Sequence, residues 1–301
     1  MTRRLSVAFF GVFCLALFFF NHEIIQSLVR FSMNGNNQAS HIVLIPFITA
    51  TLIWMKKKEI FNDVRYSFIG GTTVIVFGSA ASVAARSAAG WLSENDYLTL
   101  TVSALVVTWL GGFLLCYGST CFKKALFPLL FLVFLIPIPS PLLNRVIAAL
   151  QRASADVAFV LLKLTGTPVH REGFLFQIPG LDFVVAPECS GIRSGISLFI
   201  ACNLAGHLLL RSMWRRAALV LTAIPILIFK NAIRIDTLTL LAIHFDKRIL
   251  TSRLHTEGGI PFFVVGLLLL YPVLALLIES ERQRAENRSP FFRLSFSRGR
   301  I

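Results

Sequence analysis

Apolar runs close to the length of a membrane span alternate along the chain with short polar segments. The runs cover residues 5–20, 41–55, 66–90, 97–118, 125–138, 191–210, 217–243 and 259–278. A helix needs about 20 apolar residues to cross a bilayer, and shorter runs are accommodated by local thinning. The pattern predicts an all-α membrane fold, a polytopic bundle of about eight transmembrane helices. The first run follows Arg3 and Arg4 like a signal peptide, but no small-x-small cleavage site follows it, which favours an uncleaved first helix.

Residues 141–164 are long enough to span but carry charges at regular helical intervals. Arg145, Arg152, Asp156 and Lys163 are spaced 7, 4 and 7 apart, so they form one narrow stripe on a helix. Such a stripe suits an interfacial helix better than a lipid-facing span. The segment is therefore predicted to lie on the outer surface of the membrane that the other helices span. If it crossed that membrane as a ninth span, the orientation of every later span would be reversed.

Alternation with a period of two appears in residues 169–188. Phe174, Phe176 and Ile178 alternate with other residues, and the same pattern resumes after the turn dipeptide Pro179-Gly180. This pattern predicts a small extracytoplasmic β-hairpin that leads to Cys189. An open edge along residues 174–178 would accept an extended peptide by strand addition.

Composition and charge agree with a membrane protein. The chain is 55% hydrophobic with a mean hydropathy of +0.73 and a net charge of +14. The basic residues stand in short groups between apolar runs, which excludes nucleic acid as a partner and leaves the lipid bilayer. Most of the 29 Lys and Arg residues fall on one side if the N-terminus is cytoplasmic. The positive-inside rule then places both termini in the cytoplasm.

Cys189, in the segment APECSGIRSG, has two interpretations. The five cysteines form no CxxC or Cys/His ligand pattern, and a buried cysteine is commonly inert packing. However, Pro187 and Glu188 suit a helix start, which would place Cys189 in a first turn whose N–H groups favour a thiolate. Arg193, at i+4, would add positive charge to the same face, while Ser190 and Gly191 leave the sulfur accessible.

Polar residues also interrupt the apolar run at 217–243. Lys230, Asn231, Arg234 and Asp236 lie inside it, and charges at that depth are costly unless they are paired or functional. One interpretation is a structural ion pair of Asp236 with Lys230 or Arg234. The other is a site, because Asn231 and Arg234, at i and i+3, share one helical face.

His255 precedes Gly258-Gly259 and the last apolar run. A loop histidine is commonly a solvated surface residue. In the predicted topology, however, Cys189 opens one span from outside, Arg234 lies near the outer end of the next, and His255 precedes the third. Three residues from consecutive spans are thus expected at one membrane level.

The chain resembles the exosortase/archaeosortase family of membrane cysteine transpeptidases in three motifs. These are ECSGIRS at 188–194, NAIR at 231–234, and His255 followed by Gly-Gly and an apolar helix. The segment REGFLFQIPGLDFVVAPECSG also resembles the hairpin of that family. The resemblance covers residues 171–278, which it implies are the catalytic core of a transmembrane domain over residues 1–278. Residues 279–301, rich in Arg and Ser, are expected to be a flexible basic cytoplasmic tail.

The resemblance implies a catalytic triad of Cys189, Arg234 and His255 facing the periplasm or exterior. Glu188, Ser190, Arg193 and Asn231 are then candidates for substrate binding or for orienting the triad. The implied substrates are membrane-anchored proteins with C-terminal sorting signals of the PEP-CTERM kind, processed at the cytoplasmic (inner) membrane. No cofactor or metal site is indicated by the sequence, and it leaves the oligomeric state open.

Two other function classes also fit intramembrane charges. In a transporter, Arg234 and Lys230 would bind an anion beside Pro-interrupted helices. A glycan polymerase or ligase would also use arginine. Neither class requires Cys189, so dependence on this cysteine separates them from the transpeptidase.

Overall fold

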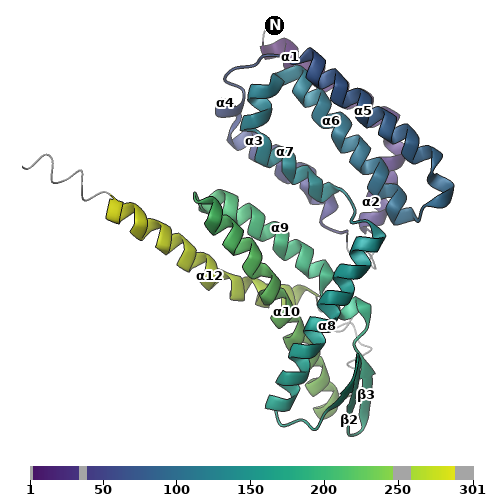
Figure 1. Cartoon of the computed structure of the whole chain (residues 1–301), viewed down its shortest axis with the longest axis vertical. Helices are drawn as coiled ribbons and strands as arrows, with labels where there is room; N and C mark the ends of the chain where they lie inside the picture. Colours follow the sequence, from purple (N-terminus) through teal and green to yellow (C-terminus); the bar gives the residue numbers. More distant parts are fainter. Residues whose placement is uncertain (1–2, 34–38, 247–258, 289–301) are drawn as a thin grey trace, which may run out of the picture. The chain divides into compact units, whose positions relative to one another are not determined.

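The computed structural model describes residues 3–33, 39–246 and 259–288. The chain forms two compact units, residues 1–144 and 145–301 (Figure 1). The helices of the first unit are α1 (Arg3–Phe20), α2 (His22–Met33), η1 (Ile42–Leu44), α3 (Ile45–Met55), α4 (Lys57–Ile60), α5 (Phe68–Ser87), η2 (Ala89–Trp91), α6 (Glu94–Lys124), α7 (Leu126–Phe131) and η3 (Leu132–Leu135). The remaining elements are α8 (Ser140–Leu164), which begins in the first unit, β1 (His170–Glu172), β2 (Leu175–Ile178), β3 (Leu181–Val184), η4 (Pro187–Ser190), α9 (Ile192–Leu209), α10 (Met213–His244) and α12 (Gly259–Arg288).

Close contact between α5 and α6 organises the first unit. A Cβ added to Gly71 would lie 2.5 Å from the Leu115 Cα, and one added to Gly111 would lie 2.8 Å from the Ile75 backbone nitrogen. Small residues let two backbones approach closely, which is how helices gain packing in lipid. α6 starts at an N-cap, where the Ser93 hydroxyl accepts from the Asp96 amide at 3.2 Å.

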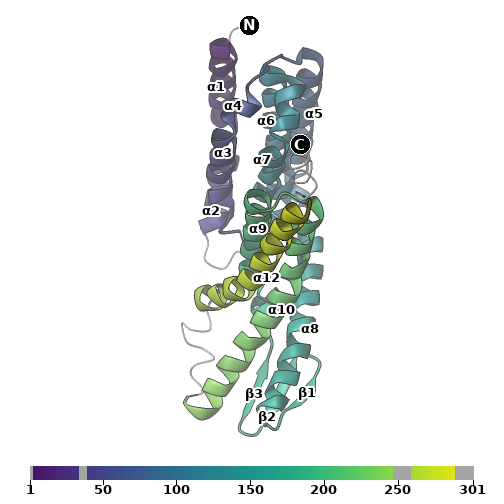
Figure 2. The ribbon, with the colours of Figure 1, turned by 90° about the vertical axis from the view of Figure 1, so that its left-hand side faces the viewer.

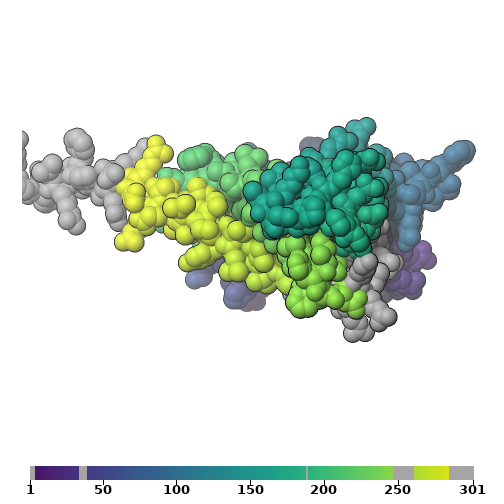
Figure 3. Space-filling model, turned by 90° about the horizontal axis from the view of Figure 1, so that it is seen from below, coloured from purple at the N-terminus to yellow at the C-terminus, as the bar shows by residue number. Residues whose placement is uncertain are grey.

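The second unit packs a three-stranded antiparallel sheet, in the order β1-β2-β3, beside α8 and α10 (Figure 2). β2 and β3 are joined by Pro179-Gly180, with Ile178 opposite Leu181. Gly180 has φ 82°, which is the left-handed conformation that a type II turn needs after proline. α8 and the sheet, in teal, and the end of α10, in green, form much of the face seen in Figure 3.

Three long helices complete the second unit. α10 packs against both α9 and α12, and Gly195 of α9 meets α10 so closely that an added Cβ would lie 2.5 Å from Leu227 Cδ2. At one end, Glu281 of α12 accepts from the backbone N–H groups of Arg211 at 2.9 Å and Ser212 at 2.8 Å. This carboxylate therefore ties α12 to the loop between α9 and α10.

The helical membrane architecture predicted from the apolar runs is confirmed. Five of the described helices are long and apolar enough to span, and two bent pairs raise the number to seven. The remaining predicted run corresponds to the shorter apolar helix at residues 42–55. Residues 125–138 form only α7 and η3, because the prolines at 137 and 139 cannot continue a helix. α12 runs past Ile278, where the basic tail was expected to begin, to Arg288.

The predicted hairpin and amphipathic helix are both present. β1 was not predicted, and it pairs with β2 so that Glu172 lies opposite Leu175. β2 is therefore the central strand, and the predicted open edge along residues 174–178 is wrong. In α8 the four predicted charges are all exposed, whereas Gln151, Ser154, Ala155, Ala158 and Leu162 are buried.

Candidate functional site

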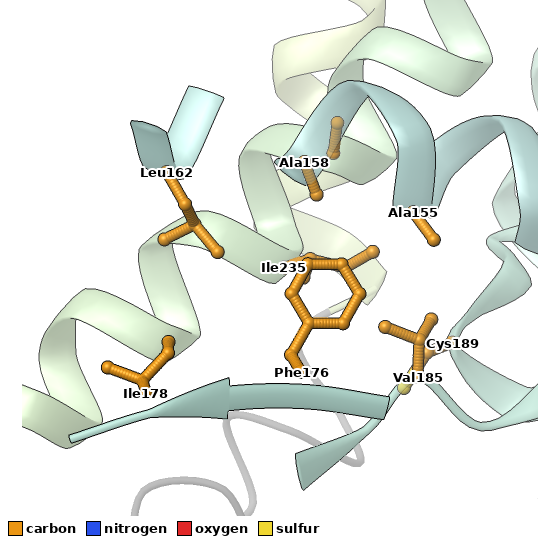
Figure 4. Packing of buried hydrophobic residues seen from close by; sticks show 9 residues of the cluster. Ala155, Ala158, Leu162, Phe176, Ile178, Val185, Cys189 and Ile235 are labelled. Carbon is orange, nitrogen blue, oxygen red and sulfur yellow. The ribbon is translucent and has the colours of Figure 1, made fainter. Parts of the chain in front are cut away.

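Cys189 lies at the end of a buried cluster formed by the sheet, α8 and α10. The cluster contains Ala155, Ala158, Leu162, Phe176, Ile178, Val185, Cys189, Ala232 and Ile235. Figure 4 shows the Phe176 ring in its middle, with Val185 and Cys189 together at one side. Phe176 is fully buried and Cys189 is 9% exposed. The sulfur-bearing residue is thus held by a packed apolar base and not by a mobile surface loop.

The turn that carries Cys189 is not the first turn of a long helix, so that prediction is wrong. Pro187–Ser190 forms the 3₁₀ turn η4, closed by the Cys189 amide donating to the Ala186 carbonyl at 2.9 Å. Gly191 then adopts φ 73° and ψ 11°, and α9 begins only at Ile192. A left-handed residue interrupts the helical repeat, so the expected i, i+4 relation of Cys189 and Arg193 is lost.

Two neighbouring residues of α10 hold this turn. Asn231, fully buried, donates from Nδ2 to the Cys189 carbonyl at 2.6 Å. Lys230, 2% exposed, donates from Nζ to the Ser194 hydroxyl, and that hydroxyl donates to the Gly191 carbonyl at 3.1 Å. The backbone on both sides of Ser190 is therefore fixed by hydrogen bonds from or through α10.

Gly191 also leaves room for Asn231. A Cβ at this position would lie 2.7 Å from the Asn231 Oδ1, closer than nonbonded atoms tolerate. Both the backbone angle and the contact therefore require glycine here. This explains physically why a small residue follows the Cys-Ser pair.

Cys189 and Arg234 line the same small cavity. Its volume is about 40 Å³, and the other lining residues are Phe183, Val184, Val185, Ile235, Leu238 and Thr239. Val185 and Leu238 are buried, whereas Val184 is 60% exposed, so the cavity has an apolar floor and opens at the surface. The arrangement places one nucleophile and one permanent cation at a common, largely apolar space.

The other predicted site residues are distributed as follows. Glu188 and Ser190 belong to η4, and the Ser190 side chain is fully buried. Arg193 is exposed on α9. His255 lies outside the described residues. The structure therefore brings together Cys189, Arg234 and Asn231 from the predicted set.

The suggested ion pair of Asp236 is not present in the described part of the chain. Lys230 contacts Ser194 instead. The Asp236 side chain is 6% exposed, and its Oδ1 has no hydrogen-bond partner among the described residues. Residues two apart on a helix point in different directions, which explains why Arg234 and Asp236 do not pair.

Two residues that support the site were not predicted. Gln151 of α8 donates from Nε2 to the Val185 carbonyl at 2.5 Å, fixing the chain just before η4. The sequence feature that could have revealed Gln151 is its polarity, since it lies on the apolar face of the amphipathic segment 141–164. Ser194 had no comparable signal, because its partner Lys230 is 36 residues away. Among the described residues no group of three His, Cys, Asp or Glu side chains is placed to hold a metal ion.

Comparison with known proteins assigns the family. Residues 32–272, most of the chain, match the model of the transmembrane exosortase family (Exosortase_EpsH). No curated protein and no solved structure matches the chain. The match includes the sheet, the Cys189 turn and all of α10, with several helices that can span a membrane. The chain thus belongs to the transmembrane exosortase family and is a multi-pass membrane protein of a transpeptidase family.

Proposed function

We propose that this protein is a cysteine transpeptidase that cleaves C-terminal sorting signals from membrane-anchored proteins, with Cys189 as its nucleophile. The observation that carries the proposal is that Cys189 and Arg234 line one small, largely apolar cavity. Family membership favours this chemistry over the transporter and glycan polymerase. His255 completes the proposed triad on the basis of the sequence resemblance.

The chemistry follows from the residue types. The Cys189 thiolate attacks the scissile carbonyl carbon and forms a tetrahedral oxyanion. The guanidinium of Arg234 donates to that oxyanion. His255 protonates the departing amine as the C–N bond breaks, leaving a thioester on Cys189. An acceptor amine or water, deprotonated by His255, then attacks the thioester carbonyl carbon, and the C–S bond breaks to release the Cys189 thiolate.

Delivery of the substrate uses the membrane. A substrate with a transmembrane helix and a basic cytoplasmic tail diffuses in the same plane as the enzyme, and its signal reaches the outer face of the cytoplasmic (inner) membrane. We place the active site on that face and both termini in the cytoplasm, in accordance with the distribution of basic residues. A PEP-CTERM-like signal is the proposed motif.

The sheet offers a way to hold the signal. β3 has no strand on its outer side among the described residues, and Phe183 and Val184 of β3 line the cavity that contains Cys189. An extended peptide added to β3 would run toward the sulfur, with its backbone hydrogen bonds satisfied by the strand. The proposed docking edge is therefore β3, not β2.

The test is processing of a co-expressed protein that bears a C-terminal sorting signal. Cys189→Ala is expected to abolish processing, because no other group in the proposed triad can form the thioester. Cys202→Ala is the matched control, since Cys202 is also buried but lies in α9, away from the cavity lining. The readout is the fraction of substrate cleaved at equal membrane levels of each variant.

Trapping the intermediate gives a second readout. Wild-type protein and substrate are expected to form a covalent adduct that hydroxylamine cleaves and that Cys189→Ala does not form. Processing retained by Cys189→Ala, or an adduct that persists in that variant, would overturn the proposal.

A further inference from the structure

The first unit contains a large apolar cavity that the proposed chemistry does not use. Its volume is about 860 Å³, and its walls come from α1, α2, α3, α6 and η3, with Phe61 and Lys57 near the end of α3. This size falls in the range of sites that hold a small organic ligand. The lining is predominantly hydrophobic and aromatic, so the occupant must present a large apolar surface.

The rim of this cavity is open to an acyl chain. Phe18 and Trp54 line the cavity and are 53% and 67% exposed. An acyl chain that enters beside these two rings meets an apolar wall.

A basic cluster marks one end of the cavity. Lys57 is the charged residue of the lining, and its Nζ lies 4.5 Å from the centre of the Trp54 ring. Lys56 and Lys58 flank it, and all three are exposed. Glu59 is the acidic neighbour within this cluster, while Asp63 forms an ion pair with Arg65 at 3.0 Å. The end of the cavity thus carries net positive charge, which suits an anion.

A buried hydroxyl gives the cavity a second polar feature. Thr49 lines it, is 3% exposed, and its Oγ1 has no hydrogen-bond partner among the described residues. Helical threonines normally donate to the carbonyl four residues back, as Thr51 does to Phe47 and Thr108 does to Ala104, both at 2.8 Å. The Thr49 hydroxyl therefore lacks an internal partner within an otherwise apolar wall.

We propose that this cavity binds one anionic glycerophospholipid, with an acyl chain between α1, α3 and α6, the phosphate at Lys57, and an ester oxygen accepting from Thr49. The combination of a long apolar volume, a hydroxyl within it and cations at one end matches the layout of that molecule. A substrate helix with a basic cytoplasmic tail fits less well, because its charge has the same sign as Lys56–Lys58. The inference does not depend on the proposed transpeptidase reaction.

Native mass spectrometry of the purified full chain tests this inference. The protein is reconstituted in nanodiscs of equal phosphatidylglycerol and phosphatidylcholine, released, and scored for the lipid that stays bound. We expect one retained phosphatidylglycerol per wild-type chain, in clear excess over phosphatidylcholine. Lys57→Gln should lower that preference about fivefold, the effect of one cation near a lipid phosphate, whereas Lys123→Gln, which is not in the lining, should leave it unchanged.

The hydroxyl and the volume are tested separately. Thr49→Val should lower retention of phosphatidylglycerol about threefold, as expected for one lost hydrogen bond, and Thr51→Val should not. Ala50→Phe, which adds a phenyl ring to the cavity lining on α3, should lower retention of the lipid while the protein stays monodisperse in detergent. Equal retention of the two lipids, or the same loss in Lys123→Gln as in Lys57→Gln, would overturn the proposal.

Discussion

Each unit has a largely apolar cavity, and the two cavities differ greatly in volume. The cavity in the first unit has a volume of about 860 Å³ and an apolar lining with Lys57 at its end. The cavity in the second unit has about 40 Å³, and Cys189 and Arg234 face it together. The first is large enough for a lipid chain, whereas the second has room for little more than water.

The difference in volume suits the first cavity to lipid binding and the second to catalysis. A wide apolar cavity binds by contact area, so small changes of its lining are tolerated. A small cavity beside a nucleophile depends on the position of individual atoms, and a misplacement of about 1 Å can cost a hundredfold in rate. The hydrogen bonds from Asn231 to the Cys189 carbonyl and through Ser194 to Gly191 fit this second requirement.

The largest expected loss of processing comes from substituting Arg234, the cation that lines the small cavity. Arg234→Lys keeps the charge but removes the planar guanidinium, and we expect processing of the sorting signal to fall about a hundredfold or more, as for the loss of one oxyanion donor. The measurement is the initial rate of cleavage in membranes. Arg152→Lys, on the exposed face of α8, is the control, and equal rates for Arg234→Lys and wild type would remove Arg234 from the proposed mechanism.

A smaller but still large effect is expected at the turn. Gly191→Ala forces a non-glycine residue into the left-handed region at a cost of about 1–2 kcal/mol and presses the new Cβ against Asn231. We expect processing to fall about tenfold or more, because the Cys189 carbonyl loses its fixed position. Processing and thermal unfolding in detergent are measured together.

Gly166→Ala is the control that separates backbone strain from the contact with Asn231. Gly166 has φ 75°, but nothing lies within 4 Å of an added Cβ. This variant should show a similar loss of stability from backbone strain and nearly normal processing. If the two variants lost processing equally, the contact with Asn231 would not matter for the site.

The smallest effect is expected in the large cavity. Lys57→Arg keeps a cation at the phosphate, and an apolar site of this size adjusts to the longer side chain. The preference for phosphatidylglycerol over phosphatidylcholine in the nanodisc measurement should stay within about twofold of wild type. A change as large as that of Lys57→Gln would mean that this cavity also requires exact placement, and the contrast between the two units would fail.

Much of the fold follows from the sequence because bilayers impose simple rules. Apolar length predicted the five long helices, although the run at 125–138 forms only α7 and η3. The charge spacing of residues 141–164 predicted the exposed face of α8. The two-residue alternation with Pro179-Gly180 located β2 and β3. β1 escaped notice because His170–Glu172 is a polar strand of three residues, whose pairing depends on a neighbour and not on its own pattern.

Less of the site was predictable. Cys189, Asn231 and Arg234 stand out in sequence, since polar residues are rare in such runs. The 3₁₀ turn could not be predicted from the sequence, because a helix start and a turn closed by Gly191 have the same Pro and Gly residues. The contacts of Gln151 with Val185 and of Lys230 with Ser194 join distant segments, so they required the packing of α8, α9 and α10.

The buried polar residues of α10 also bear on how the protein is made. Lys230, Arg234 and Asp236 each cost about 2.5–3.5 kcal/mol to insert at the centre of an isolated helix. Lys230 finds its partner, Ser194, on α9, and Gly266 of α12 leaves room for its side chain, at 3.6 Å from an added Cβ to Lys230 Cδ. We therefore expect α10 to insert into a membrane more favourably together with α9 and α12 than alone.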